Sequence, residues 1–154
     1  FIENALIKAR YASEKTGLPA IADDSGLCVD ILGGEPGIYS ARWAKTYGDF
    51  DRASKKIIEL VKGKNKNKKI KNTKAKFICS LTFCFNGTKT TTVIGVIKGK
   101  ISKQLLGKKG FGYDPIFIPK GSQITFGQMS KRKKMLMDHR FIAFKKLKRK
   151  INTL

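Results

Sequence analysis

Apolar residues recur at helical spacing in a stretch near each end of the chain. In residues 2–16 the apolar positions at this spacing are Ile2, Ala5, Leu6, Ala9 and Ala12. Gly17 and Pro19 end that pattern, so it predicts a helix that stops before them. A second helix is predicted from Asp138 onward. The side chains that we expect it to bury are Phe141, Phe144, Leu147 and Ile151.

The middle of the chain predicts one more helix and a hairpin. The helix runs from Asp49 or Asp51 to Val61, and Gly63 is expected to end it. Residues 77–85 and 90–97 are rich in β-branched and aromatic residues, which favour strands. Asn86-Gly87 between them is a strong signal for a tight hairpin turn.

A short apolar run at residues 20–22 ends in Asp23, Asp24 and Ser25, and residues 28–32 then resume an extended pattern. Ligands collect at strand ends in α/β sheets, so the paired acids there suggest a metal site or a general base. Asp, Ser and Gly are also the residues that turns favour. Without further information, a turn between two strands is the simpler interpretation.

Two glycine-rich segments predict shaped loops. Residues 33–43 contain three glycines and a proline and lead to Tyr39, Arg42 and Trp43, which either pack against the protein or cover a ligand. Residues 107–112 are the second such segment, and a ring at Phe111 can present its face to a base. As a bare pattern, this segment is also typical of loops without a ligand.

Ser130 predicts the cap of a short helical turn, and Lys134 and His139 follow it. Residues five apart on one helix point roughly 140° away from each other, so a shared ligand would require a break between them. Asp138 is a suitable place for that break. His139 and Arg140 would then lie at a helix N-terminus, which favours anions; the alternative for His139 is an ordinary surface histidine.

Length and composition indicate one globular domain of 154 residues, with 41% hydrophobic residues. No stretch approaches the roughly 20 apolar residues of a membrane span, so no membrane association is expected.

Cys28, Cys79 and Cys84 form no CxxC pair, and there is one histidine, which argues against a zinc site and favours a reducing cytoplasm. Any metal is expected to be a hard cation held by carboxylate and phosphate oxygens.

The net charge of +22 would attract any polyanion. Lysine far outnumbers arginine, so the excess of positive charge is as typical of a general lysine bias in composition as of a surface that binds nucleic acid. Residues 64–76 carry seven lysines and no aromatic side chain that could stack on a base, and they predict a solvated loop. A basic protein can equally act on an acidic small molecule such as a nucleotide.

Several of these segments, taken in order, resemble one family, the inosine triphosphate pyrophosphatases. The matching segments are residues 1–5, 8–10, 18–27, 33–42 and 110–117, with the spaced set Phe126-Gly127, Met129-Ser130, Lys134 and His139-Arg140. The most specific are Asp-Asp-Ser-Gly-Leu at 23–27 and Gly-Phe-Gly-Tyr-Asp-Pro at 110–115. The match extends from Phe1 to about Leu147.

The resemblance implies an α/β fold with a mixed central sheet, flanking helices and two lobes around a nucleotide cleft, formed by residues 1–154 as a single domain. It implies Mg²⁺-dependent hydrolysis of ITP, dITP and XTP to the monophosphate and pyrophosphate, which cleanses the nucleotide pool. It also implies a cytoplasmic homodimer with no membrane partner and no specific nucleic acid.

The resemblance also assigns roles to individual residues. Asp24 matches the general base, which also helps to hold the metal; a carboxylate is suited to both tasks. Asp23 beside it is expected to be structural. The remaining matches are substrate contacts, at Lys8, Ser25, Phe111, Gly112, Tyr113, Asp114, Lys134, His139 and Arg140. Among them, Phe111 matches the ring that stacks on the base, and donors aimed at a 6-keto oxygen would disfavour adenine.

The chain departs from the family's pattern in three ways. Lys109 stands where the family usually has Gly, and Asp138 where it usually has Ser. We expect the family's N-terminal strand, its triphosphate-binding loop and an acidic metal ligand to lie upstream of Phe1, which would make residues 1–154 alone weak or inactive. Glu3 does not match that ligand. The alternatives are a basic nucleic-acid-binding protein and a decayed, non-catalytic one.

Overall fold

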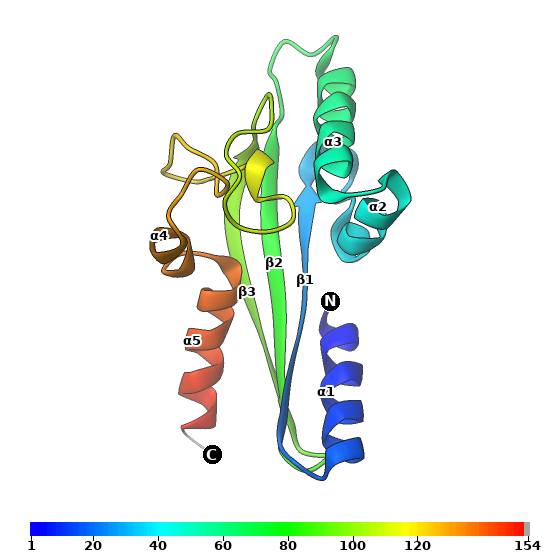
Figure 1. Ribbon diagram of the computed structural model, residues 1–154, viewed down its shortest axis with the longest axis vertical. Coiled ribbons are helices and arrows are strands. Elements are labelled where there is room, and N and C mark those ends of the chain that lie inside the picture. The colour runs from blue at the N-terminus through cyan, green and yellow to red at the C-terminus, as the bar shows by residue number, and fades with distance from the viewer. Residues whose placement is uncertain (153–154) are drawn as a thin grey trace. The chain divides into compact units, whose positions relative to one another are not determined.

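The computed structural model describes residues 1–152, which form helices, 3-10 turns and a four-stranded sheet in the order β1-β2-β3-β4 (Figure 1). The α/β class with flanking helices is confirmed, whereas the strands of the described sheet all run antiparallel to their neighbours and do not form the mixed sheet that was expected. The chain divides into two compact units. The first contains Phe1–Ser25, Ile78–Val96 and the segment from Met137, and the second contains Gly26–Phe77 and Ile97–Leu136. A cleft between two lobes stays a prediction.

The first unit places helices α1 (Ile2–Thr16) and α5 (His139–Ile151) on opposite faces of the strands (Figure 1). Both helices were predicted. Gly17 ends α1 in the left-handed conformation, with φ of 69°, which glycine adopts without strain. On α5 the prediction that Phe144 is buried was wrong, because its side chain is 52% exposed. The core beneath α5 is formed by Cys79, Val93, Ala143 and Leu147.

Strand β1 (Ala20–Val29) passes through the two aspartates without a turn. The prediction of a turn there was wrong, and so was that of a second strand over 28–32, since a 3-10 helix occupies Asp30–Leu32. Turn propensity reflects polar side chains that bond to their own backbone. In β1 the carboxylates of Asp23 and Asp24 instead bond to side chains from distant helices, so the backbone stays extended.

The predicted hairpin is confirmed as β2 (Lys74–Cys84) and β3 (Thr90–Ile101). Backbone N–H of Phe85 donates to the carbonyl of Lys89 across the turn, at 2.9 Å. β2 begins three residues before its predicted start, so Lys74 and Lys76 lie in a strand and not in the solvated loop expected at 64–76. Gly95 in β3 has no room for a side chain, because a Cβ there would collide with the backbone carbonyl of His139.

The second unit contains helices α2 (Ser40–Tyr47), α3 (Phe50–Asn65) and α4 (Lys131–Met135) and strand β4 (Phe117–Pro119). The interpretation of residues 33–43 as one loop was wrong at its end, where α2 begins. α3 starts after the Asp49 cap, as predicted, but it continues past Gly63. Asn65 explains this, since its amide donates to the carbonyls of Val61 and Asn72 and so joins the helix end to the following segment.

An aromatic cluster forms part of the core of the second unit. The ring of Phe117 lies 4.7 Å from that of Phe77 and 5.3 Å from that of Phe126, measured between centroids. Phe77 and Phe117 come from β2 and β4, so the cluster joins the face of the sheet to the segment after β4. In residues 1–152 we find no helix with the length and apolar character that crossing a bilayer requires.

Candidate active site

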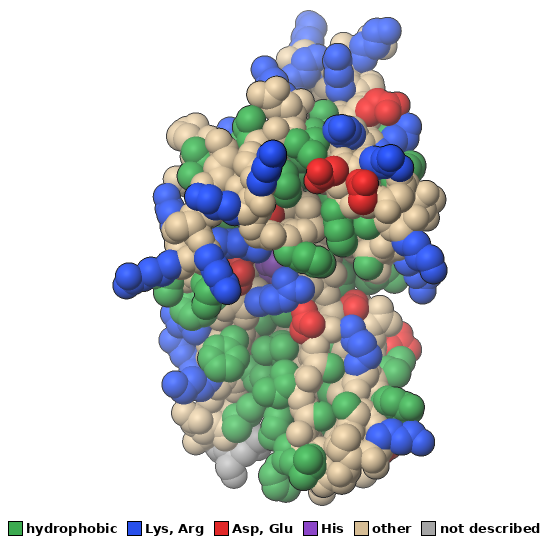
Figure 2. All heavy atoms as spheres, viewed as in Figure 1, with side chains coloured by type: hydrophobic (Ala, Val, Ile, Leu, Met, Phe, Trp, Pro, Cys, Tyr) green, Lys and Arg blue, Asp and Glu red, His purple; other side chains and the backbone are tan. Residues whose placement is uncertain are grey.

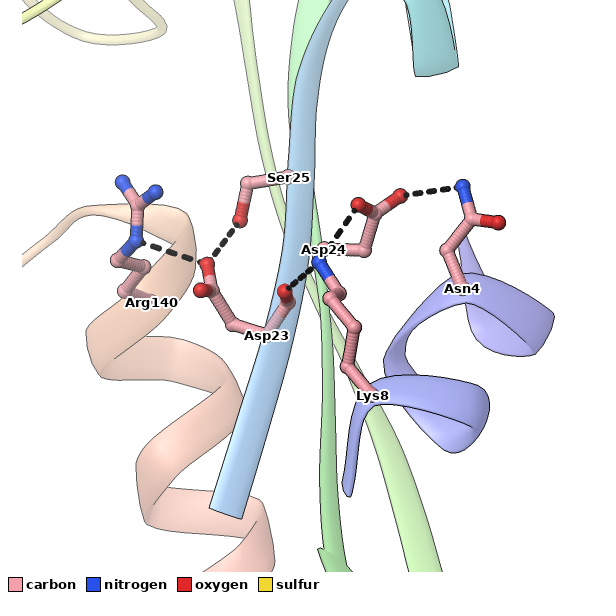
Figure 3. Close-up of polar contacts among 6 residues, drawn as sticks. All are labelled: Asn4, Lys8, Asp23, Asp24, Ser25 and Arg140. Atoms are coloured by element: carbon pink, nitrogen blue, oxygen red, sulfur yellow. Dashed lines mark hydrogen bonds and ion pairs between the residues drawn. The ribbon is translucent and has the colours of Figure 1, made fainter. Parts of the chain in front are cut away.

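Asp23 and Asp24 point to opposite faces of β1, because successive side chains of a strand alternate (Figure 3). Asp24 faces α1, and Asp23 faces α5 together with Ser25, two residues further along the strand. The two neighbouring carboxylates therefore have separate environments and different partners. All of these residues belong to the first unit.

The carboxylate of Asp24 is held by two side chains of α1. Lys8 donates to Oδ1 at 3.0 Å, and Asn4 donates to Oδ2 at 3.2 Å. Lys8 also donates to the backbone carbonyl of Asp23, at 2.5 Å. The Asp24 side chain remains 18% exposed and that of Lys8 50% exposed, so solvent or a ligand can reach both groups.

Asn4 was missed in the sequence, although a signal for it existed. It precedes Lys8 by four residues, and positions four apart lie on one face of a helix. Once Lys8 is a candidate on the predicted helix 2–16, Asn4 is the residue one turn away that can reach the same group. The structure brings both to Asp24 (Figure 3).

Asp23 has structural partners, in keeping with its expected role. Oδ2 of Asp23 accepts from the Ser25 hydroxyl at 2.8 Å and from Nε of Arg140 at 3.1 Å. Arg140 lies in the first turn of α5, so this ion pair joins β1 to the beginning of that helix. Because Ser25 donates to Asp23, a phosphate oxygen would have to compete for its hydroxyl proton.

The beginning of α5 is capped by Asp138, whose carboxylate accepts from the backbone N–H of Phe141 at 2.8 Å. Ser and Asp are both favoured N-cap residues, which explains how Asp138 can stand where a serine is usual. His139 follows it and is only 3% exposed. The alternative of an ordinary surface histidine was therefore wrong. Its place at the start of α5 was predicted correctly.

Cys79 on β2 lies near this cluster. Burial raises the pKa of its thiol, and a hydrogen bond with Ser25 lowers it. The charge of Asp23 raises this pKa further, and that of Arg140 lowers it. A thiol with a raised pKa stays protonated near neutrality and is a poor nucleophile. Cys28, Cys79 and Cys84 are all buried and free, so Cys79 contributes packing to this site.

In the second unit, Asp114 organises residues 110–114, which overlap the loop predicted at residues 107–112. It is 2% exposed, and its Oδ2 accepts from the backbone N–H of Phe111 at 2.6 Å and from Nζ of Lys134 at 2.5 Å. Gly110 has φ of 82°, and a Cβ there would collide with the Asp114 carboxylate. The loop therefore needs a glycine at this position and an acid at 114.

Phe111 projects from that loop and is 67% exposed, so its ring is accessible to a ligand. The ring of Phe50 supports it from the start of α3, with edge-to-face contacts to Phe111 and Tyr113 at centroid distances of 5.2 Å each. Nothing in the sequence pattern pointed to Phe50, since its contacts are distant along the chain. Gly112, between the two rings, also lies beside Phe50.

Tyr113 is buried, and its hydroxyl donates to the backbone carbonyl of Ser40 at 2.8 Å. Burial raises the pKa of this hydroxyl, with a smaller contribution from Tyr47, so it stays protonated and keeps donating. The Ser40 hydroxyl in turn accepts from the backbone N–H of Leu27. Tyr113 therefore joins the loop to α2 and to the end of β1, and its predicted contact with substrate stays a prediction.

The break predicted between Lys134 and His139 is present. α4 ends at Met135 after its Ser130 cap, and α5 begins at His139. Lys134 belongs to the second unit and His139 to the first. Whether they contact one ligand stays a prediction.

Within residues 1–152 there is no cluster of three or more His, Cys, Asp or Glu side chains that could enclose a metal ion. Mg²⁺ does not need such a cage, because it is commonly held by one or two carboxylates together with substrate phosphates and water. Asp24 is a partly exposed carboxylate with a neighbouring amide at Asn4 and is suited to that mode of binding.

Comparison with known proteins matches residues 1–150 to the model of the Ham1 family. The chain is 43% identical over 149 residues to the dITP/XTP pyrophosphatase of Zymomonas mobilis, covering 96% of this chain and 69% of that protein. It is 44% identical over 148 residues to the dITP/XTP pyrophosphatase of Caulobacter vibrioides, covering 96% and 74%.

Solved structures agree with this match. A HAM1 protein from Coxiella burnetii superposes with a TM-score of 0.90 at 34% identity, covering 100% of this chain and 77% of that one. The Ham1 protein of Staphylococcus aureus superposes with a TM-score of 0.80 at 36% identity, covering 99% and 77%. Sequence and fold thus agree along residues 1–150, and this protein belongs to the Ham1 family.

Proposed function

We propose that this protein hydrolyses non-canonical purine nucleoside triphosphates, ITP, dITP and XTP, to the monophosphate and pyrophosphate. The observation that carries the proposal is the partly exposed Asp24 carboxylate, held between Lys8 and Asn4 on the face of β1 toward α1. The relatives named dITP/XTP pyrophosphatase, at 43% and 44% identity, support this choice of substrate.

Asp24 acts as the general base. Its carboxylate accepts a proton from the water that attacks the α-phosphorus; the bond from that phosphorus to the bridging oxygen breaks, and pyrophosphate leaves. Lys8 and Asn4 fix the orientation of the carboxylate, since each donates to a different oxygen. Proton transfer by a positioned side chain contributes about 10²–10⁴-fold to a rate.

The other predicted residues bind the substrate. The Lys8 ammonium and the Ser25 hydroxyl contact phosphate oxygens, for which charge-assisted hydrogen bonds are strong. Phe111 stacks on the purine, and Gly112, Tyr113 and Asp114 complete the wall behind it. Donors from Lys134, His139 and Arg140 select a 6-keto oxygen, because an adenine 6-amino group would leave a donor facing a donor.

The proposal includes Mg²⁺ as cofactor, with Asp24 as its ligand from this chain together with substrate phosphates. When bound, it polarises phosphoryl oxygens and neutralises their charge. We also propose a homodimer that acts in the cytoplasm, where the three free cysteines would remain reduced.

The proposal is tested by turnover of ITP, ATP and GTP by the complete gene product, with and without Mg²⁺, assaying pyrophosphate and orthophosphate separately. We expect Mg²⁺-dependent release of pyrophosphate that is selective for ITP. Release of orthophosphate alone, or equal rates for ITP and ATP, would contradict the proposal.

Replacing Phe50 with Leu is expected to raise KM for ITP by roughly 2–10-fold and to leave kcat nearly unchanged. The reason is that Phe50 contacts Phe111 and Tyr113 but lies outside the reacting groups, and an aromatic pair is worth about 0.5–1.5 kcal/mol. Steady-state kinetics measures both constants. Trp43→Leu is the matched control, because it removes the edge contact with Tyr47 on α2, at 5.8 Å, and no contact with Phe111.

A further inference from the structure

A hollow of about 920 Å³ in the second unit is rich in lysines. Its lysines are Lys71, Lys74, Lys76, Lys98, Lys100 and Lys120. They occupy 6 of its 15 lining positions, whereas lysine and arginine together make up 33 of the 154 residues of the chain. Asp30 is the single acid in the lining. The hollow is therefore more basic than the composition alone would make it.

The alternation of side chains along three strands produces this concentration. On β2, Lys74 and Lys76 alternate with the buried Ala75 and Phe77. β3 and the end of β4 repeat the pattern: Lys98, Lys100 and Lys120, which directly follows β4, occupy one face, while Ile101 and Phe117 are buried on the other. One face of the sheet is thus the core, and the other carries lysines.

The strand register brings these lysines into rows. The N–H of Ile101 donates to the carbonyl of Thr73, which places Lys76 opposite Lys98. The N–H of Lys120 donates to the carbonyl of Lys98, so Lys120, directly after the end of β4, continues the same row. Neighbouring strands are about 4.8 Å apart, and like charges directly opposite each other are destabilising.

These ammonium groups are available to a ligand. Among the described residues, none of Lys74, Lys76, Lys98, Lys100 and Lys120 has an ion-pair or side-chain hydrogen-bond partner. The sixth, Lys71, donates to the carbonyl of Asn65. The general excess of positive charge is visible in Figure 2, where Lys and Arg side chains cover more of the face shown than Asp and Glu do.

We propose that this lysine-lined hollow binds the phosphodiester backbone of single-stranded nucleic acid without reading its sequence. Backbone phosphates would relieve the repulsion within the row Lys76, Lys98 and Lys120. The volume lies within the roughly 300–1,000 Å³ of ordinary ligand sites, so the hollow has room for a short stretch of one strand. No aromatic ring lines it, so it offers no stacking that would distinguish one base from another.

This activity is independent of the proposed hydrolysis, and its residues are distinct from those assigned to the catalytic site. For binding to single strands, each phosphate contact makes the slope of log K against log salt more negative by about 0.7. The three contacts made by Lys76, Lys98 and Lys120 should therefore contribute about −2 to the total slope.

The test is fluorescence anisotropy of labelled oligothymidylate and oligoadenylate with the complete gene product, at salt concentrations from roughly 50 to 200 mM. We expect equal affinity for both strands. The variant Lys76→Gln/Lys98→Gln/Lys120→Gln should bind at least about tenfold more weakly, with a slope that is less negative by about 2. The matched control Lys55→Gln/Lys62→Gln/Lys64→Gln, on the exposed surface of α3, removes the same charge at positions that do not line the hollow.

Three outcomes would overturn the inference. The first is an equal loss of affinity in the control, which would mean diffuse attraction by the net charge. The second is displacement of the oligonucleotide by excess ITP, which would place it in the nucleotide site. The third is lysine-dependent binding of inorganic polyphosphate with no binding of either oligonucleotide. Circular dichroism and ITP turnover, unchanged in both variants, would show that each remains folded.

Discussion

Replacing Asp24 with Asn is expected to lower Mg²⁺-dependent release of pyrophosphate from ITP by about 10²–10⁴-fold, mainly through kcat. Asn has nearly the same shape but cannot accept a proton from water at neutral pH. It can still contact Lys8 through its amide oxygen, so α1 and β1 should keep their arrangement. Initial rates with pyrophosphate detection measure the effect, and circular dichroism shows whether the variant is folded.

Asp23→Asn is the matched control, because it makes the same chemical change at the neighbouring position on the other face of β1. Asp23 pairs with Arg140 and Ser25, so its replacement should loosen the start of α5 and cost less than about tenfold in rate. If Asp24→Asn kept most of the turnover, or if Asp23→Asn lost more of it, the assignment of Asp24 as the base would be wrong.

Replacing Asp114 with Ala is expected to lower the free energy of unfolding by about 3–5 kcal/mol, because it leaves the Lys134 ammonium without its partner. The Lys134 side chain is 15% exposed and that of Asp114 2%, so water cannot compensate fully. Thermal and urea unfolding measure the change. For a chain of this size it corresponds to a fall in Tm of roughly 6–20 °C.

Glu59→Ala is the control for that measurement. It breaks an ion pair with Lys56 of 3.0 Å, on the exposed surface of α3, and should cost less than about 1 kcal/mol. The double variant Asp114→Ala/Lys134→Met should be more stable than Asp114→Ala, since it removes the unpaired charge. Equal stability of these two variants would mean that loss of the hydrogen bond to Phe111, and not the buried charge, causes the effect.

Much of the fold could be predicted where a local rule decides the structure. Helix α1 follows from its apolar spacing, with Gly17 as its end, and the Asn86-Gly87 turn fixes the hairpin of β2 and β3. Asp138 correctly predicted the start of α5. These signals lie within a few residues of the elements that they determine, and no distant contact overrides them.

The errors arose where distant contacts outweigh local preference. Residues 23–25 have turn propensity, yet they continue β1 because their side chains bond to Lys8, Asn4 and Arg140. Gly63 would normally end a helix, but the side chain of Asn65 bonds to Asn72 and lets α3 continue. In both cases the side-chain contact that decides the structure is made by a residue that is far away in the chain or outside the local sequence pattern on which the prediction was based.

The residues of the candidate site likewise divide into those that a local sequence pattern predicts and those that depend on distant contacts. The motifs named Asp24, Lys8, Phe111 and the residues around them, because those residue types occur in a distinctive order. Phe50 was not predicted, because its support of Phe111 depends on α3 packing beside a loop about 60 residues later in the chain. Asn4 was within reach of prediction through its four-residue spacing from Lys8.

By itself, the sequence of this protein determined its family resemblance, its principal helices, its hairpin and the pair of neighbouring acids that contains the proposed base, Asp24. Only the tertiary structure decided how those acids differ. Alternation along β1 turns Asp24 toward Lys8, 16 residues away, and Asp23 toward Arg140, 117 residues away. The same alternation, acting across β2, β3 and β4, collects lysines from separate segments into one hollow. Spacing along a chain shows which side chains share a face, but their partners depend on which elements pack against that face.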